Sequence, residues 1–264
     1  LFAKALAAGP VTPQLTLAYS HVLLGLGDFG RGWPLYESRV GLAGQGAEPP
    51  PLAHEWQGEP IAGKRVLVWP EQGFGDQIQF VRYALALRAL GADVRLACPP
   101  ELHPLFAELP LDVVTGDAAL SGEPPDYWTL ALSAPGRLGV SMAKVSGEAY
   151  LAAPADRRAK WRGQVPPGSV GVAWRGRASH PNDSHRSLPS AASLEPLREA
   201  GGYLVDLTEP RGDFADLAAI VEQLDLVITV DTALGHLAGA LGKPCWLLLP
   251  WFRQDWRWLQ GRED

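Results

Sequence analysis

Apolar residues along this chain recur with two spacings, which predict helices first and alternating strands and helices afterwards. Helical spacing over residues 12–27 and 29–40 predicts two helices joined at Gly27 and Asp28, and the Asp28 side chain can cap the second helix. Residues 41–63 are rich in Gly and Pro and have no period, which predicts a linker. From residue 64 onward, short apolar runs alternate with amphipathic stretches.

The strand and helix signals fall into two blocks separated by a second linker at residues 151–168. In the first block, residues 64–150, strands are predicted at 66–69, 94–98, 111–114 and 127–132, with helices after Asp76 and Pro99-Pro100. In the second, residues 169–264, strands are predicted at 170–174, 203–207, 226–230 and 244–249, with helices at 190–200, 214–223 and 232–241. This alternation is typical of parallel sheets covered by helices. Two such sheets leave a cleft between them, and ligands bind at the carboxyl ends of the strands.

Composition narrows the class of protein. With 47% hydrophobic and 20% charged residues, the 264-residue chain has an ordinary globular make-up, and its net charge of −6 argues against broad binding to a nucleic-acid backbone. No apolar run is long enough for a membrane span and no signal peptide is visible, although the chain starts at Leu1 rather than Met. Cys98 and Cys245 lie in apolar, strand-like runs, which indicates buried free thiols and a reducing cytoplasm.

The loop after the first strand carries the first candidate group. Its Gly-Phe-Gly-Asp sequence resembles the start of a dinucleotide site, but Ile78 replaces the third glycine and Cys98 stands where an acidic residue would hold a ribose. Asp76 would also repel a pyrophosphate, so we exclude an NAD site. At the mouth of a cleft its carboxylate can accept a proton from an acceptor hydroxyl, although capping of the next helix explains an Asp there more simply.

A second motif, Val-Asp-Thr-Ala-Leu-Gly-His, lies where a strand ends and a helix begins. The unpaired amides and the positive dipole end of such a helix attract a diphosphate. The small residues Thr232, Ala233 and Gly235 permit its approach, and the Thr232 hydroxyl can donate a hydrogen bond. Asp231 can cap the helix or hold a sugar hydroxyl, and His236 can face the cleft or the sheet.

The polar loop after Trp174 forms a local basic cluster in an otherwise acidic chain, with Arg175, Arg177, His180, His185 and Arg186. No further ligand at suitable spacing supports a metal site, so we interpret the two histidines as solvated loop residues. Arg186 stands just before the next helix and can neutralise a diphosphate leaving group.

The N-terminal helices resemble a tetratricopeptide repeat, whose signature of turn, aromatic and small residues is matched by Gly27, Asp28, Phe29, Gly32 and Tyr36. Residues 1–9 would then be the last helix of a preceding repeat. Arrays of such repeats bind partners on a concave face, so a protein partner is one expectation for residues 1–40. Packing of this short fragment on the next domain is the alternative that we prefer.

The stretches WPEQGFGDQIQFVRYA and VITVDTALGHLAGALGKPCWLLLP, with RSLP between them, resemble glycosyltransferase family 9, the heptosyltransferases. More closely, the chain resembles bacterial tetratricopeptide-repeat proteins that end in such a domain. The resemblance implies a GT-B fold with two Rossmann-like lobes, an acceptor lobe at 64–150 and a nucleotide-sugar lobe at 169–264. It also implies inverting sugar transfer without a metal. Ala233 departs from the family's glycine, and the chain ends before the closing helix usual in GT-B enzymes.

We therefore expect an inverting transferase that moves a sugar from a nucleotide-diphosphate donor to a hydroxyl of a protein or glycan, with no cofactor. The resemblance makes Asp76 the base and assigns the donor to Arg186, Asp231, Thr232, Ala233, Gly235 and His236. Further candidates for donor-phosphate or cleft contacts are Gly73, Gly75, Gln77, Trp174 and Arg175. The alternatives are a tetratricopeptide interaction protein with a degenerate, non-catalytic transferase domain, and a two-lobed nucleotide-sugar epimerase.

Overall fold

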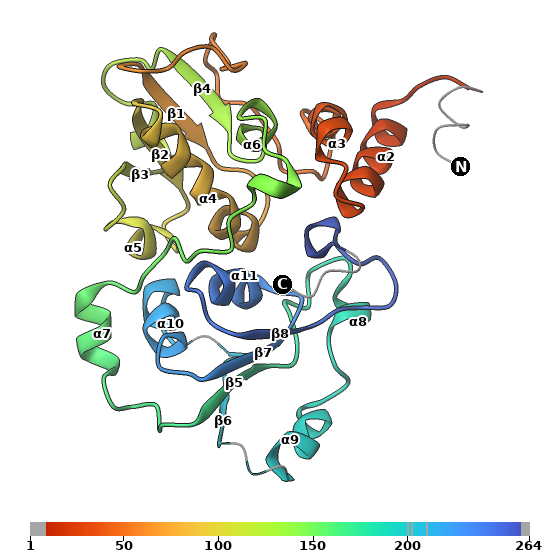
Figure 1. Cartoon of the computed structure of the whole chain (residues 1–264), viewed down its shortest axis with the longest axis vertical. Helices are drawn as coiled ribbons and strands as arrows, with labels where there is room; N and C mark the ends of the chain where they lie inside the picture. Colours follow the sequence, from red (N-terminus) through yellow and green to blue (C-terminus); the bar gives the residue numbers. More distant parts are fainter. Residues whose placement is uncertain (1–8, 200, 202, 210, 260–264) are drawn as a thin grey trace.

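The computed structural model describes residues 9–199, 201, 203–209 and 211–259. It consists of an N-terminal helical pair and two α/β lobes, one above the other in Figure 1. The helical pair lies beside the first lobe, and the described C-terminal residues return from the second lobe toward that pair. This arrangement places the strand-end loops of both lobes where they face each other.

The first lobe is a parallel sheet in the order β3-β2-β1-β4. Its strands are β1 (Arg65–Trp69), β2 (Asp93–Cys98), β3 (Asp112–Thr115) and β4 (Tyr127–Leu130). Its helices are α4 (Phe74–Ala89), α5 (His103–Phe106) and α6 (Ala134–Arg137), with 3-10 turns at Gly116–Leu120 and Met142–Lys144. The apolar run in the middle of β1 is continuous because both faces of this central strand are buried.

The second lobe is a parallel sheet in the order β6-β5-β7-β8. Its strands are β5 (Ser169–Ala173), β6 (Tyr203–Asp206), β7 (Leu226–Val230) and β8 (Cys245–Leu248). Its helices are α8 (Asp183–Arg186), α9 (Glu195–Glu199), α10 (Phe214–Val221) and α11 (Ala233–Ala240), with 3-10 turns at Ala191–Leu194 and η5 (Trp256–Trp258). The predicted α/β class with parallel sheets is thereby confirmed.

The N-terminal helices are α2 (Pro13–Gly25) and α3 (Phe29–Tyr36). Asp28 caps α3 as predicted, because its carboxylate accepts a hydrogen bond of 3.3 Å from the Arg31 amide. The expected helix of a preceding repeat, residues 1–9, falls almost wholly outside the described residues. The pair itself is packed against both the first lobe and η5.

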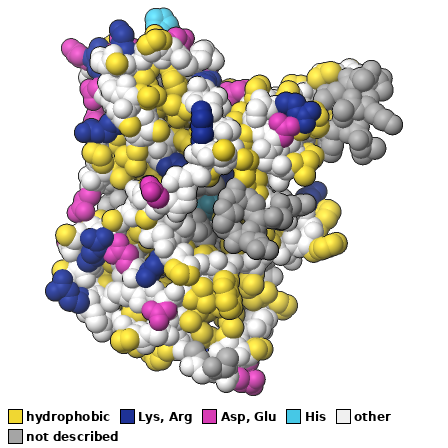
Figure 2. All heavy atoms as spheres, in the orientation of Figure 1, with side chains coloured by type: hydrophobic (Ala, Val, Ile, Leu, Met, Phe, Trp, Pro, Cys, Tyr) yellow, Lys and Arg dark blue, Asp and Glu magenta, His cyan; other side chains and the backbone are white. Residues whose placement is uncertain are grey.

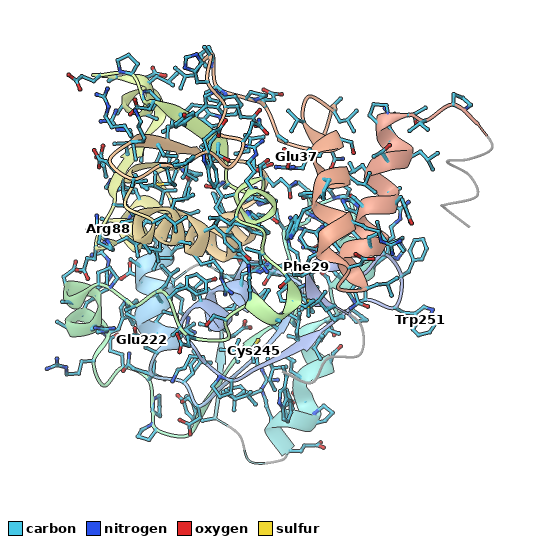
Figure 3. The ribbon with its side chains drawn as sticks, turned by 45° about the horizontal axis from the view of Figure 1, so that its top comes forward. Phe29, Glu37, Arg88, Glu222, Cys245 and Trp251 are labelled. Carbon is cyan, nitrogen blue, oxygen red and sulfur yellow. The ribbon has the colours of Figure 1, made fainter. Side chains whose placement is uncertain are left out.

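A fully buried ion pair fixes the helical pair to the first lobe. Arg39, in the 3-10 turn Glu37–Arg39 after α3, donates to both carboxylate oxygens of Glu71 at 2.9 and 2.8 Å, and neither side chain is exposed. Glu71 also accepts a hydrogen bond of 2.7 Å from the Leu132 amide, so its charge is well compensated. Glu37, which Figure 3 labels where the helical pair meets the first lobe, pairs with Arg137 from α6.

The two stretches that we expected to be linkers are both packed. Residues 41–63 contain no helix or strand, yet Trp56 is buried and its amide donates to the Trp128 carbonyl at 2.7 Å. Residues 151–168 contain the helix α7 (Ala155–Trp161), whose good helix formers follow Pro154. Conversely, the helix expected after Pro99-Pro100 is only the four-residue α5.

One apolar cluster runs through the helical pair, the first lobe and helices α10 and α11 of the second lobe; it includes Leu24, Val68, Ile78, Ala218 and Leu237. Helix α4 packs directly against α11, so the two lobes share part of their core. Figure 2 shows further apolar side chains on the surface of the second lobe. Two exposed tryptophans belong to this lobe: Trp246 lies in β8, and Trp251 projects into solvent, as Figure 3 shows. Within the described ranges, no helix is long and apolar enough to cross a lipid bilayer.

Candidate functional site

The two lobes enclose a cleft of about 1370 Å³ at the carboxyl ends of their central strands. The loops after β1, β2, β5, β6 and β7 line it together with Arg253, Asp255 and Arg257 in and before η5. Of the residues that the sequence nominated, those in the lining are Gly73, Gly75, Asp76, Gln77, Arg175, Arg186, Asp231, Thr232, Ala233 and His236. The chain therefore brings the two sequence motifs and the basic loop to one cavity, as parallel α/β sheets do with ligand-binding loops.

Two nominated residues lie elsewhere. Trp174 is not part of the cleft lining, because its ring packs in the small core of Val172, Leu194 and Ile228 behind β5. Gly235 is buried on the sheet side of α11, where an added Cβ would lie 3.0 Å from Leu247 Cδ1. Its small size therefore serves packing of α11 on the sheet rather than approach of a diphosphate.

The loop before α4 has a constrained backbone. Gln72 adopts a positive φ of 59°, a conformation that side chains other than glycine seldom take. Its amide donates to the Gly46 carbonyl at 3.1 Å, and its side-chain amide donates to the Tyr36 hydroxyl at 3.0 Å. Neighbouring Glu71 is held by the buried Arg39 pair. The helical pair and residues 41–63 thus both fix the loop that presents Asp76.

Asp76 caps its helix and faces the cleft at the same time. One carboxylate oxygen accepts a hydrogen bond of 2.9 Å from the Gly73 amide, so Asp76 closes a capping box as the third residue of α4, whereas the sequence suggested that it was the N-cap residue itself. The other oxygen lies 2.7 Å from Nη2 of Arg257, and the Asp76 side chain keeps 20% exposure. The capping and functional interpretations are therefore compatible.

Arg257 is the cleft residue that sequence reasoning missed. It lies in η5, and its guanidinium contacts Asp76, both oxygens of Asp255 at 3.0 Å and the Gln72 side-chain oxygen at 2.8 Å. Its side chain is only 5% exposed. An arginine between two tryptophans after the last strand was the available signal, but the sequence showed no contact between positions 257 and 76.

The start of α11 has the form expected of an anion-binding helix terminus. Thr232 is the N-cap residue, and its hydroxyl accepts a hydrogen bond of 3.3 Å from the Leu234 amide. Asp231 does not cap the helix; its carboxylate accepts a hydrogen bond of 3.0 Å from Nε1 of Trp258. Burial and the nearby Asp255 raise the pKa of Asp231.

His236 faces the first lobe, one turn into α11. Its ring stacks on Trp258 at 4.5 Å, and its Cδ2 atom would lie 2.5 Å from a Cβ placed on Gly75. Loss of hydration lowers the pKa of His236 to about 4, so the ring is neutral at neutral pH. The glycine in the first motif therefore admits a neutral imidazole from the opposite lobe.

The basic loop reaches the same place. Nη1 of Arg186 donates a hydrogen bond of 2.6 Å to the Asp231 carbonyl, and its Nε lies 3.4 Å from Asp183. Arg175 is exposed and paired with Glu209, whereas Arg177 lies over the Phe74 ring at 5.8 Å. Arg186 is therefore fixed beside the α11 terminus, where a diphosphate would need a cation.

The described residues do not form a metal centre. No group of three or more His, Cys, Asp or Glu among them could hold an ion. His180 lines the cleft, but His185 is not among its lining residues. Burial raises the pKa of both Cys98 and Cys245 to about 11, and neither thiol lines the cleft.

Known proteins resemble this chain in sequence and in fold. The model of glycosyltransferase family 9 (heptosyltransferase) matches residues 197–246, from α9 into β8. Protein FlbA of Caulobacter vibrioides is 27% identical over 285 residues, which cover 89% of this chain and 48% of that protein. The chain thus spans about half the length of this curated relative.

Among solved structures, the bacterial iron-containing dodecameric glycosyltransferase TibC from enterotoxigenic E. coli H10407 is similar with a TM-score of 0.54 and 14% identity, over 72% of this chain and 59% of TibC. A glycosyltransferase family 9 protein from Veillonella parvula DSM 2008 has a TM-score of 0.53 and 12% identity, over 73% of this chain and 82% of that one. These likenesses concern the fold. Together with the family match, they support a glycosyltransferase with a family 9 domain.

One expectation needs correction. The resemblance implied sugar transfer without a metal or other cofactor, yet the structural neighbour TibC is described as iron-containing. The expectation that this protein needs no cofactor is therefore contradicted by the likeness to TibC. The described part of this chain offers no set of side chains suited to iron, so no step of the reaction below is assigned to such a group.

Proposed function

We propose that this protein is an inverting glycosyltransferase that moves a sugar from a nucleotide-diphosphate donor to a hydroxyl group of a protein or glycan. The observation that carries the proposal is the placement, across one cleft, of a carboxylate from the first lobe and an anion-binding helix terminus from the second. A heptosyltransferase structure of the same fold, TibC, contains ADP-D-β-D-heptose, which makes an ADP-sugar the first donor to test.

In the proposed reaction, Asp76 accepts the proton of the acceptor hydroxyl while that oxygen attacks the anomeric carbon. The bond from this carbon to the diphosphate breaks on the opposite face, which inverts the configuration. Arg186, the Thr232 hydroxyl and the first amides of α11 stabilise the charge on the departing diphosphate. His236 is neutral and lies between the two halves of the site, where it can donate or accept a hydrogen bond to the donor.

The helical pair packs on the first lobe and η5, and we propose that, in addition, tetratricopeptide repeats of this kind recruit a protein acceptor. The support is the turn signature around Gly27 and Asp28 and the observed pair of capped helices. Cys98 and Cys245 are free thiols, as is usual in a reducing compartment, and we propose that the reaction takes place in the cytoplasm.

Calorimetric titration with ADP, UDP, GDP and dTDP tests the proposed donor site. We expect one nucleotide to bind, and Arg186→Ala combined with Thr232→Val to weaken it by at least about 100-fold, since charge-assisted hydrogen bonds contribute about 1.5–3 kcal/mol each. Arg95→Ala is the control, because Arg95 pairs with Asp112 on β3, away from the cleft lining. Failure of the folded protein to bind all four nucleotides would favour the degenerate interaction protein instead.

A further inference from the structure

The geometry points to Arg257 as a positioning residue that holds the Asp76 carboxylate in the orientation required of the base. This inference rests on the proposed function. Nη2 of Arg257 lies 2.7 Å from one oxygen of Asp76, and the Gly73 amide donates to the other at 2.9 Å. With each oxygen tied on one side, the carboxylate plane is fixed and each oxygen keeps a lone pair for an acceptor hydroxyl.

Arg257 can hold Asp76 because it is itself held from several directions. Nη1 of Arg257 donates to both carboxylate oxygens of Asp255 at 3.0 Å, and Nη2 donates to the side-chain oxygen of Gln72 at 2.8 Å. The guanidinium lies over the Trp256 ring at 4.5 Å. A planar guanidinium with five donors can make these contacts together, whereas the ammonium of a lysine, on a flexible chain, cannot.

The segment that carries Arg257 is anchored on the N-terminal helices. The Trp256 ring packs edge-on against Trp33 and Tyr36 of α3, each at 5.5 Å between ring centroids. Gly25, at the end of α2, also lies against Trp256, since a Cβ there would be in ordinary van der Waals contact with its Cα, at 3.7 Å. The tryptophan before Arg257 is therefore seated on the helical pair, and orientation of the base depends on three parts of the chain.

Loss of Arg257 should affect turnover and spare donor binding. In Arg257→Met the Asp76 carboxylate loses one of its two restraints, and misplacement of a catalytic group by about 1 Å costs on the order of 100-fold in rate. We expect kcat to fall 10- to 100-fold with KM for the donor changed less than about threefold. Arg257→Lys should lose less activity than Arg257→Met, because lysine keeps the positive charge but lacks the planar set of guanidinium donors.

The assay follows release of the nucleoside diphosphate during hydrolysis of ADP-D-β-D-heptose, UDP-glucose, GDP-mannose and dTDP-glucose, where water replaces the acceptor. A double-mutant cycle separates positioning from general damage: in the Asp76→Asn background, Arg257→Met should have no further effect on kcat. Arg95→Met, which removes an ion pair on β3, is the matched control and should retain wild-type kinetics.

Two results would overturn the inference while leaving the donor site intact. The first is wild-type kcat in Arg257→Met, and the second is an equal loss in the presence and absence of Asp76. A crystal structure of Arg257→Met adds a test without turnover: the Asp76 carboxylate should rotate, and an unmoved carboxylate contradicts the positioning role. If the wild-type protein binds none of the nucleotides, the proposed function fails, and this inference fails with it.

Discussion

The closest approach of the two lobes gives a sharp test of the structure at Gly75. This residue is the second of α4, and an added Cβ would lie 2.5 Å from Cδ2 of His236 and 3.3 Å from the Cα of Ala233. The imidazole cannot simply turn away, because it is stacked on Trp258 at 4.5 Å. In Gly75→Ala the new methyl group must therefore push α11 away from α4 or unstack the ring.

Two opposing effects determine how much Gly75→Ala changes the free energy of unfolding. Overpacking in a well-packed contact costs about 1–3 kcal/mol, and this contact lies at the upper end because real Cβ atoms do not approach a neighbour to 2.5 Å. The gain from replacing Gly by Ala in a helix is about 0.5–1 kcal/mol. We therefore expect a net loss of roughly 2 kcal/mol, which lowers the melting temperature by about 4–8 °C in a chain of this size.

Gly239→Ala provides the matched control. Gly239 lies in α11, and an added Cβ there would meet no atom within 4 Å, so only the helix propensity changes. Thermal unfolding followed by circular dichroism should show Gly239→Ala slightly stabilised and Gly75→Ala destabilised. Equal stabilisation of the two variants would refute the contact between α4 and His236.

Two further predictions concern buried ionisable groups, the ion pair of Arg39 with Glu71 and the imidazole of His236. Arg39→Met should lower the free energy of unfolding in urea by about 3–5 kcal/mol, because it leaves Glu71 buried without its cation. Arg95→Met should lower it by at most about 1 kcal/mol, as expected of an exposed pair. Similar losses in the two variants would contradict the buried pair. The pKa of His236 is lowered from 6.5 to about 4, so the unfolded chain binds more protons between these values. The free energy of unfolding should therefore decrease as the pH falls from about 6.5 to 4, and His236→Gln should show a weaker dependence in the same titration.

Local patterns predicted most of the regular structure, since strands and helices of α/β lobes carry clear apolar periods. The runs before Asp76 and Asp231 became central parallel strands, and the helices near them begin within three residues of the predicted starts. Predictions were poorer where proline dominated the sequence. Pro99-Pro100 opens only a short turn of helix, and the proline-rich stretch 151–168 still forms α7.

The candidate site was predicted in part, for a physical reason. Residues at strand ends could be placed in a cleft because parallel sheets bring these ends together. Which face of a helix a side chain occupies depends on the packing partner, so the sequence did not show that Gly235 lies against Leu247 of the sheet and outside the cleft lining. Arg257 could not be foreseen, since its contact with Asp76 spans most of the chain and no local period encodes it.

The buried pair between Arg39 and Glu71 bears on how this chain can be divided and recombined. A domain boundary at residue 63, just before the first α/β block, would remove Arg39 and leave the Glu71 carboxylate buried without a cation. It would also remove Trp33 and Tyr36, on which the Trp256 ring packs. Chimeras that exchange transferase domains should therefore carry the two preceding helices with them. A recombination point within or after the helical pair should therefore cost stability through the lost Arg39–Glu71 contact, whereas one upstream of α2 leaves that contact intact.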